Sequence, residues 1–557
     1  MKITTIVKHT GYAVLCAALL AACSQGTSQT SGASTEAVTT ASAKAASAQT
    51  LGYVGEIDKT KIMTFSVDVD ETKWQEMLDS ASDKEYIPAD VTINGTTIKN
   101  VGIRPKGNSS LKQVVQDDTT DRYSFKIKFD EYVDGQTWMG LDKIVVNNMQ
   151  SDSSYMKEYL SYDIMSYIGV DAPLFAFADI QVNGKAWGFY LAVEVIDDSF
   201  LDRTKDGEGE VYKPNNDGDD DRMGVGGNMP GAPDAADGGA NGVAAAQNGI
   251  PQAGGNGNRG PGGGGMNGAQ NGVSLVYTDD EISSYSAIFD NAVTKTDESG
   301  YQRVIAALKN LSTGTDLAST VDVDAVLKYF AAHTVVVNMD SYTSNMGHNY
   351  YLYEKDGQLS MLPWDYNMAF GGFQSGTASD VVNQAIDTPL SGVSLEDRPI
   401  LGKLLEVPEY KEKYHQYLQQ IVTGYFAGGK FEQTVASLDQ LIGSHVENDP
   451  SAFSTYDAYK AAVAELSKLG ALRAESIQGQ LDGNIPSTTD GQTADASALI
   501  DASSVDLSKL GSGMGGGGRG GFGGGQGRFP NGTNGGGQTN AQPGSDPVGQ
   551  PTASPAS

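Results

Sequence analysis

The chain has 557 residues, of which 69 are Asp or Glu and 38 are Lys or Arg, giving a formal net charge of −31 at pH 7. A surface this acidic repels nucleic acid and anionic membranes, which excludes both as expected partners. It also repels ATP, so a nucleotide site would need local Lys or Arg side chains and divalent cations to reverse the field. The length favours several domains, but long polar stretches cannot bury a core, so one large domain is predicted.

The first residues are typical of an export signal. Lys2 and Lys8 precede an apolar stretch at 11–22 that is too short to span a bilayer. The stretch ends Leu20-Ala-Ala-Cys23, which resembles a bacterial lipobox and predicts cleavage before Cys23 and lipidation of that residue. An ordinary signal peptide with a chance cysteine is the alternative. No later segment has about 18 consecutive apolar residues, so the mature protein is expected to be lipid-anchored and not to span the membrane.

Residues 23–51 are Ser, Thr, Ala and Gln-rich and predict a disordered tether. The next region, 52–213, carries mainly strand patterns. Asn94-Gly95 and Asn183-Gly184 each separate two strand-like runs and predict hairpins. This region is therefore expected to be a mostly antiparallel sheet with one or two helices.

Residues 214–272 are rich in Gly, Asn, Ala and Pro and predict a disordered insertion. Its acidic cluster at 217–221 lacks the ligand spacing of an EF-hand, which favours a solvated run of charge over a calcium loop. Residues 273–490 have mainly helical patterns, and 491–557 form a second Gly-rich stretch that is predicted to be disordered. A sheet-rich region followed by a helix-rich one predicts an α+β fold with a ligand cleft between two lobes.

One segment of the helix-rich region points to chemistry. Asp340 follows an apolar helical pattern, Asn345 comes five residues later, and Asp365 follows a strand–turn–strand pattern. Protein kinases place a catalytic Asp and Asn at this spacing, with a metal-binding Asp downstream. Taken singly, each of these residues is equally typical of a helix cap or a turn. His333 and His348 lie nearby, but two histidines are too few for a zinc site, so both are expected to be structural.

Five sequence blocks, taken in order, resemble the CotH kinase family of spore-coat protein H-like atypical secretory protein kinases. The blocks are Gly102–Ser110, Tyr123–Phe129, Asn183–Glu194, Val211–Lys213 and Asp340–Asp365. The resemblance implies a bilobal, atypical protein-kinase-like fold, with an antiparallel-sheet-rich N-lobe at 52–213 and a helix-rich C-lobe at 273–490. It also implies ATP as the phosphate donor, Mg²⁺ or Mn²⁺ as the metal, and Ser or Thr hydroxyls of a protein as acceptors.

The resemblance also assigns roles to the acidic residues. Asp340 is expected to orient the acceptor hydroxyl and accept its proton, and Asp365 and Asn345 are expected to bind the metal. Glu194 lies among apolar residues, so it needs a partner. We expect it to pair with the active lysine or to join the metal shell.

The phosphates of ATP need cationic partners. Lys126 and Lys128 alternate onto one strand face, and the pattern does not separate them, although the resemblance favours Lys128. Further expected contacts to the nucleotide are Arg104, Lys106, Asn108, Lys213 and Trp364. Trp187 and Tyr190 are alternative stacking residues unless they belong to the core. The family commonly has Arg where Lys106 and Lys157 stand, and the two residue types bind phosphate differently.

The sequence therefore predicts an extracytoplasmic bacterial lipoprotein kinase that phosphorylates Ser or Thr on surface or secreted proteins. It would meet the membrane only through its N-terminal lipid. Two alternatives remain open. One is a non-catalytic surface protein for adhesion or envelope assembly on the same scaffold, and the other is a metal-dependent phosphohydrolase.

Overall fold

Strands dominate the first part of the chain and helices the second. The computed structural model describes residues 51–215 and 273–511, and these ranges confirm the predicted α+β class. Lipidation at Cys23, the signal peptide and the tether were predicted for residues outside those described, as were most of the insertion and the tail beyond Gly511. Within the described ranges, no helix is both long and apolar enough to cross a bilayer.

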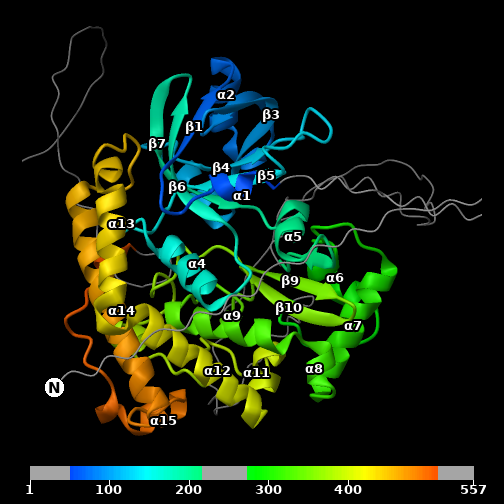
Figure 1. The fold of residues 1–557 in the computed structure, drawn as a ribbon, viewed down its shortest axis with the longest axis vertical. Helices are drawn as coiled ribbons and strands as arrows, with labels where there is room; N and C mark the ends of the chain where they lie inside the picture. Colours follow the sequence, from blue (N-terminus) through cyan, green and yellow to red (C-terminus); the bar gives the residue numbers. More distant parts are fainter. Residues whose placement is uncertain (1–50, 216–272, 512–557) are drawn as a thin grey trace, which may run out of the picture. The chain divides into compact units, whose positions relative to one another are not determined.

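Seven strands of the first range close into a barrel (Figure 1). Around the barrel they are β1 (Met63–Asp68), β2 (Ile87–Ile93), β3 (Thr96–Lys106), β4 (Ser124–Lys128), β5 (Lys143–Asn147), β7 (Lys185–Glu194) and β6 (Phe175–Val182). Six neighbouring pairs are antiparallel, as the sequence predicts. The seventh pair, β1 with β6, is parallel and closes the barrel. The predicted sheet therefore has no free edge, a feature that the local patterns did not indicate.

Both predicted hairpin turns are present. Asn94 and Gly95 have φ of 48° and 84°, and Asn183 and Gly184 have φ of 50° and 73°. Positive φ at both central residues is the geometry of a type I′ turn, whose twist matches that of the flanking strands. These turns fix the registers of β2 with β3 and of β6 with β7.

A second, three-stranded sheet joins the two described ranges. β8 (Glu210–Tyr212) comes from the end of the predicted N-lobe, yet it pairs with β9 (Tyr350–Lys355) of the predicted C-lobe. β9 pairs in turn with β10 (Gln358–Pro363), and both pairs are antiparallel. The pairing of β8 carries the segment that follows it, including Lys213, toward the residues that follow β10.

Helices and helical turns make up the rest of the ordered structure. In the first range they are α1 (Tyr53–Glu56), α2 (Glu71–Asp79), η1 (Ala81–Asp83), α3 (Ser109–Val115), α4 (Lys157–Ile168) and α5 (Asp198–Thr204). In the second range they are η2 (Ile282–Tyr285), α6 (Ser286–Phe289), α7 (Glu298–Thr313), α8 (Leu317–Thr320), α9 (Val323–Val336), α10 (Ala378–Val382), α11 (Pro399–Leu405), α12 (Pro408–Ile421), η3 (Val422–Phe426), η4 (Ala427–Gly429), α13 (Lys430–Glu447), α14 (Tyr456–Leu481), α15 (Thr489–Ala494), η5 (Ala496–Ala498) and η6 (Leu507–Leu510).

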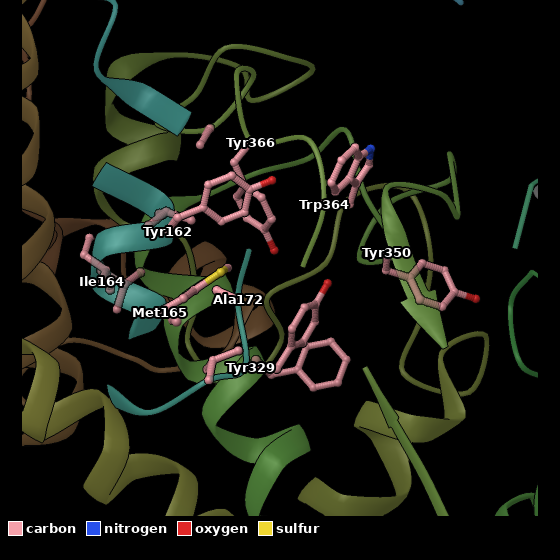
Figure 2. Packing of buried hydrophobic residues seen from close by; sticks show 14 of the residues in the cluster. Tyr162, Ile164, Met165, Ala172, Tyr329, Tyr350, Trp364 and Tyr366 are labelled. Carbon is pink, nitrogen blue, oxygen red and sulfur yellow. The ribbon is translucent and has the colours of Figure 1, made fainter. Parts of the chain in front are cut away.

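Helix α9 lies at the centre of the larger hydrophobic core. It packs against α4, α12 and β10, and every residue from Tyr329 to Val336 is buried. Figure 2 shows Tyr162 of α4 near Tyr366, and their ring centroids are 5.7 Å apart. Because α9 is closely packed on several sides, its position in the fold is fixed. The segment that follows its C-terminus, which carries Asp340, therefore begins at a defined position.

The described chain continues past the predicted end of the C-lobe at residue 490. α15 crosses that boundary, and η6, which contacts α14, lies beyond it. Leu510 is only 1% exposed. The predicted boundary is therefore too early, because a few apolar residues in a polar, Gly-rich sequence give little sign that they are packed.

Candidate active site

A pocket forms where β3, β4 and β5 of the barrel meet α4, the segment after α9 and the segment after β10. Its walls carry the cations Lys84, Arg104, Lys106, Lys126 and Lys213 and the carboxylates Glu158, Asp340 and Asp365. Asn108 and Trp364 also line it. Most of the predicted site residues thus come together from strands and helices that are distant in sequence.

Asp340 is oriented by contacts on both carboxylate oxygens. α9 ends at Val336, and the next residue, Val337, has φ of 49°, which is unusual for a β-branched residue and turns the chain sharply. His348 places its Nε2 2.7 Å from Asp340 Oδ1, and Asn349 donates its side-chain N–H to Oδ2 over 3.1 Å. The Asp340 side chain remains 20% exposed, so a ligand in the pocket can reach it.

Asp365 lies two residues after the end of β10. Pro363, which has no N–H to donate, is the last residue of that strand. Asp365 has φ of 62°, a conformation that costs a non-glycine residue about 1–3 kcal/mol and therefore needs support from its surroundings. The support includes its own N–H, which donates to Tyr162 Oη over 3.1 Å, and its carbonyl, which accepts from Asn338 Nδ2 over 3.3 Å.

The two aspartates lie close enough to affect each other electrostatically. Burial raises the pKa of Asp365, the positive charge of Lys106 opposes this rise, and the Asp340 carboxylate adds to it. Asn338 also links the two segments, because its Oδ1 accepts from the Asp340 N–H over 3.2 Å while its Nδ2 donates to Asp365. This part of the pocket therefore brings two carboxylates near each other, and a bound cation would reduce the repulsion between them.

The buried His333 contacts both the segment that carries Asp340 and the segment that carries Asp365. Its Nδ1 lies 2.9 Å from Tyr366 Oη, and its Nε2 lies 3.0 Å from Thr343 Oγ1 and 3.1 Å from Ser341 Oγ. It is buried within the core, so its predicted structural role is confirmed. His348, by contrast, lines the pocket and contacts Asp340.

Glu158 is a pocket residue that the sequence did not reveal. It lies in the first turn of α4, is 2% exposed, and accepts from Asn147 Nδ2 over 2.9 Å. Asn147 in turn accepts from Lys106 Nζ over 2.8 Å. Burial, together with the charge of Asp365, raises the pKa of Glu158 to about 7. Because α4 also carries Lys157 and Asp163, no clear signal in the sequence showed that Glu158 is buried.

The structure separates the two candidate lysines of β4. Lys126 is 6% exposed and lines the pocket. Lys128 lies two residues further along the strand, roughly 7 Å away, and does not line the pocket. Its Nζ pairs with Glu131 at 2.9 Å and with Asp130 at 3.8 Å. The preference for Lys128 is therefore corrected to Lys126, because strand alternation gives the face of a side chain but not its position along the strand.

Glu194 and Asn345 also lie away from the pocket lining. Glu194 is fully buried and accepts from Arg203 Nε over 3.0 Å, from Tyr53 Oη over 2.8 Å and from the Leu174 N–H over 2.8 Å. Its partner is thus Arg203 and not a pocket lysine. Asn345 is exposed, and Asn349 lines the pocket instead. Spacing along the chain did not show which way the loop turns each side chain.

The other residues predicted to contact the nucleotide all line the pocket: Arg104, Lys106, Asn108, Lys213 and Trp364. Arg104 and Lys106 lie on β3, and Lys106 Nζ is 5.6 Å from the centroid of the Trp364 ring. Asn108 Oδ1 accepts from Lys84 Nζ over 3.0 Å. The other two aromatic candidates do not line the pocket: Trp187 is partly buried and packs on Trp74 and Phe125, and Tyr190 is fully buried beneath Arg122.

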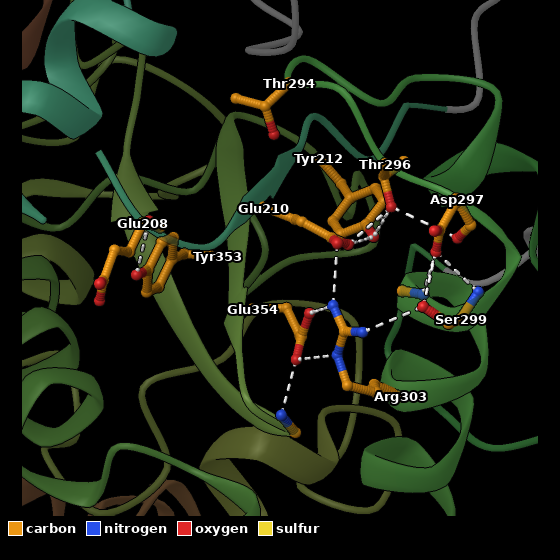
Figure 3. A network of polar contacts seen from close by, with 12 residues as sticks. Glu208, Glu210, Tyr212, Thr294, Thr296, Asp297, Ser299, Arg303, Tyr353 and Glu354 are labelled. Atoms are coloured by element: carbon orange, nitrogen blue, oxygen red, sulfur yellow. Dashed lines mark hydrogen bonds and ion pairs between the residues drawn. The ribbon is translucent and has the colours of Figure 1, made fainter. Parts of the chain in front are cut away.

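The position of Lys213 depends on β8, which is held by a network of polar contacts. Figure 3 shows Arg303 between Glu210 of β8 and Glu354 of β9. Arg303 donates to Glu354 through Nε and Nη2, each over 2.9 Å, and to Glu210 through Nη2 over 2.8 Å. Glu354 is fully buried, so this pairing compensates its charge and joins β8 and β9 to α7. Lys213 follows β8 immediately, and its Nζ lies 5.9 Å from the centroid of the Tyr351 ring.

Two aspartates and several Lys and Arg side chains line one pocket, a combination of groups that other proteins use to bind phosphate together with a divalent cation. A family model described as CotH kinase protein matches residues 103–477, more than half of the chain, and the chain belongs to this family. It is also 23% identical over 338 residues to the inner spore coat protein H of Bacillus subtilis (strain 168). That match covers 57% of this chain and 72% of the spore coat protein.

Proposed function

We propose that this protein is a CotH-type protein kinase that transfers the γ-phosphoryl group of ATP to Ser or Thr hydroxyls of proteins. The observation that carries the proposal is the pocket whose lining brings Asp340 and Asp365 together with Arg104, Lys106 and Lys126. Phosphoryl transfer depends mainly on positioning and on neutralising charge, and this pocket offers groups for both tasks. The positive charges of its Lys and Arg side chains would offset the repulsion between ATP and this acidic chain.

The donor set of the pocket fits Mg²⁺ or Mn²⁺ bound together with the nucleotide. Among the described residues, no group of three or more His, Cys, Asp or Glu is arranged to hold a metal ion. Mg²⁺ commonly uses one or two carboxylates, with phosphate oxygens and water as its other ligands. Asp365 would be the principal protein ligand, and Asn349, which lines the pocket, would be a second ligand in place of Asn345. When bound, the metal would neutralise charge on the phosphates.

Asp340 would act on the acceptor. Its contacts with His348 and Asn349 fix the carboxylate, so an acceptor hydroxyl in the pocket would donate to a preset oxygen. The hydroxyl oxygen would form the new bond to the γ-phosphorus while the bond to the β-phosphate oxygen of ATP breaks. ADP would leave with that electron pair, and Asp340 would accept the hydroxyl proton.

The side chains of the barrel would bind the rest of the nucleotide. Lys106 and Lys126 would contact phosphates, with Glu158 and Asn147 keeping Lys106 in place. Trp364 would provide a flat surface for adenine. In this proposal the barrel is the N-lobe and the helical region is the C-lobe of a bilobal, kinase-like fold.

The same proposal includes an extracytoplasmic location, with Cys23 as the lipid-bearing residue. The lipobox-like sequence supports it, and the similarity to a spore coat protein supports action at a surface. Cells fed an alkyne fatty acid should label the wild type and not a Cys23→Ser variant. Equal labelling of both would refute the anchor.

Transfer from γ-labelled ATP tests the enzymatic proposal. The purified protein is incubated with Mn²⁺ and a generic protein acceptor, beside Asp340→Ala and Asp365→Ala variants. Label on protein in the wild type alone is expected. Free phosphate without labelled protein would indicate a phosphohydrolase. If the wild type shows no transfer and no metal-dependent nucleotide binding, the kinase proposal is refuted and a non-catalytic surface protein is favoured.

A further inference from the structure

The last described residues, 500–511, form a strap that begins beyond the residues matched by the family model. At its start, Ile500 exchanges two hydrogen bonds with the Asn383 side chain, both 2.9 Å long. In its middle, Asp506 donates its N–H to Glu465 of α14 over 3.1 Å, and Lys468 donates to the Ser504 carbonyl over 3.0 Å. The strap is thus fixed to the helical region along its length.

The end of the strap is fixed to a loop of the pocket. The Leu510 carbonyl accepts from the Ser153 N–H over 3.2 Å. Lys157, which is fully buried, donates its Nζ to the Ser151 carbonyl over 3.3 Å and to the Gly511 carbonyl over 3.5 Å. Gly511 lies so close that a Cβ atom there would be 2.5 Å from the Ser151 carbonyl oxygen. Its φ of 82° also favours glycine.

The contacted loop, residues 148–155, supplies four consecutive residues to the pocket lining, Asn148 to Ser151. Its backbone is strained, because Met149, Ser151 and Tyr155 have φ of 56°, 65° and 60°. Each such residue costs about 1–3 kcal/mol and persists only where its surroundings impose it. The Gln150 carbonyl accepts from Asn367 Nδ2 over 3.2 Å, which connects the loop to the segment carrying Asp365.

We propose that the strap is a positioning element of the active site and that Gly511 is its key residue. By holding the Ser151 and Ser153 backbone, the strap maintains the strained form of loop 148–155 and so the shape of the nucleotide pocket. This inference rests on the proposed function for its catalytic consequence, but the link between the strap and the loop stands on geometry alone.

Gly511→Val in the full-length protein tests the inference, with Gly483→Val as the matched control. Gly483 also has positive φ, 74°, but a Cβ there would meet nothing within 4 Å. We expect Gly511→Val to speed amide hydrogen exchange in loop 148–155 and to lower kcat/KM for ATP roughly tenfold or more, mainly through KM. The control should leave both unchanged, and the two variants should have similar melting temperatures.

Two results would overturn the inference. One is unchanged exchange in loop 148–155 of Gly511→Val, and the other is faster exchange there without any change in nucleotide affinity. A wild type that transfers no phosphate would instead refute the proposed function. The exchange measurement needs no nucleotide, so it would still decide whether the strap holds the loop.

Discussion

Protonation of His333 should couple the stability of the fold to pH. This histidine joins the segments that carry Asp340 and Asp365, and burial lowers its pKa to about 4. In the unfolded chain an ordinary histidine has a pKa near 6.5. Between these two values the unfolded state binds a proton that the folded state does not, so lowering the pH favours unfolding. The stability that the neutral histidine contributes is complete above about pH 6.5 and is lost as the pH falls toward 4.

The two pKa values set the size of the effect. Their difference of about 2.5, at about 1.4 kcal/mol for each pH interval of 1, gives a limit of about 3 kcal/mol below pH 4. Between pH 7.5 and pH 5.0 the same linkage gives a loss of about 2 kcal/mol. For a folded region of this size, that corresponds to a fall in melting temperature of roughly 2–3 °C.

The perturbation is His333→Gln, which retains hydrogen-bonding groups but carries no titratable proton in this range. Melting temperatures of both proteins are measured at pH 7.5 and 5.0. The wild type should lose about 2 kcal/mol more than the variant, whatever the absolute stability of the variant, because the other acidic groups are common to both. Equal losses in the two proteins would refute the assignment of His333 as a buried neutral histidine.

Three further predictions follow from the placement of individual side chains. Lys126→Ala should lower kcat/KM for ATP on the order of 100-fold, whereas Lys128→Ala should change it less than about twofold. Asn349→Ala should weaken Mn²⁺-dependent activity at least roughly tenfold, and Asn345→Ala should not, as a metal titration of each variant would show. Arg303→Met should lower the free energy of unfolding by about 3 kcal/mol in denaturant titrations, because it leaves a buried carboxylate unpaired. A stability equal to that of the wild type would show that the network around Arg303 contributes nothing.

Local features of the fold were predictable because short-range physics determines them. The two Asn-Gly turns are examples, since positive φ is tolerated at those positions whatever surrounds them. The parallel pairing of β1 with β6 and the pairing of β8 with β9 were not predictable. Both join strands that are far apart in sequence, and the pattern within a strand does not identify its neighbour.

The site shows the same division. Asp340 and Asp365 were predicted from their spacing and from the apolar patterns before them, and they lie four residues after α9 and two residues after β10. Lys126 could not be chosen over Lys128 because both satisfy the same alternation. Glu158 was missed because its partners, Asn147 and Lys106, come from other strands of the barrel. Only the assembled fold shows which polar groups meet.

The most direct test of the central claim separates the roles of the two aspartates. Affinity for Mn²⁺-ATP and the rate of phosphate transfer to protein are measured for the wild type, Asp340→Asn and Asp365→Asn. We expect Asp340→Asn to bind Mn²⁺-ATP with wild-type affinity but to transfer phosphate at least about 100-fold more slowly, and Asp365→Asn to lose metal-dependent binding. Wild-type transfer rates in either variant would contradict these roles.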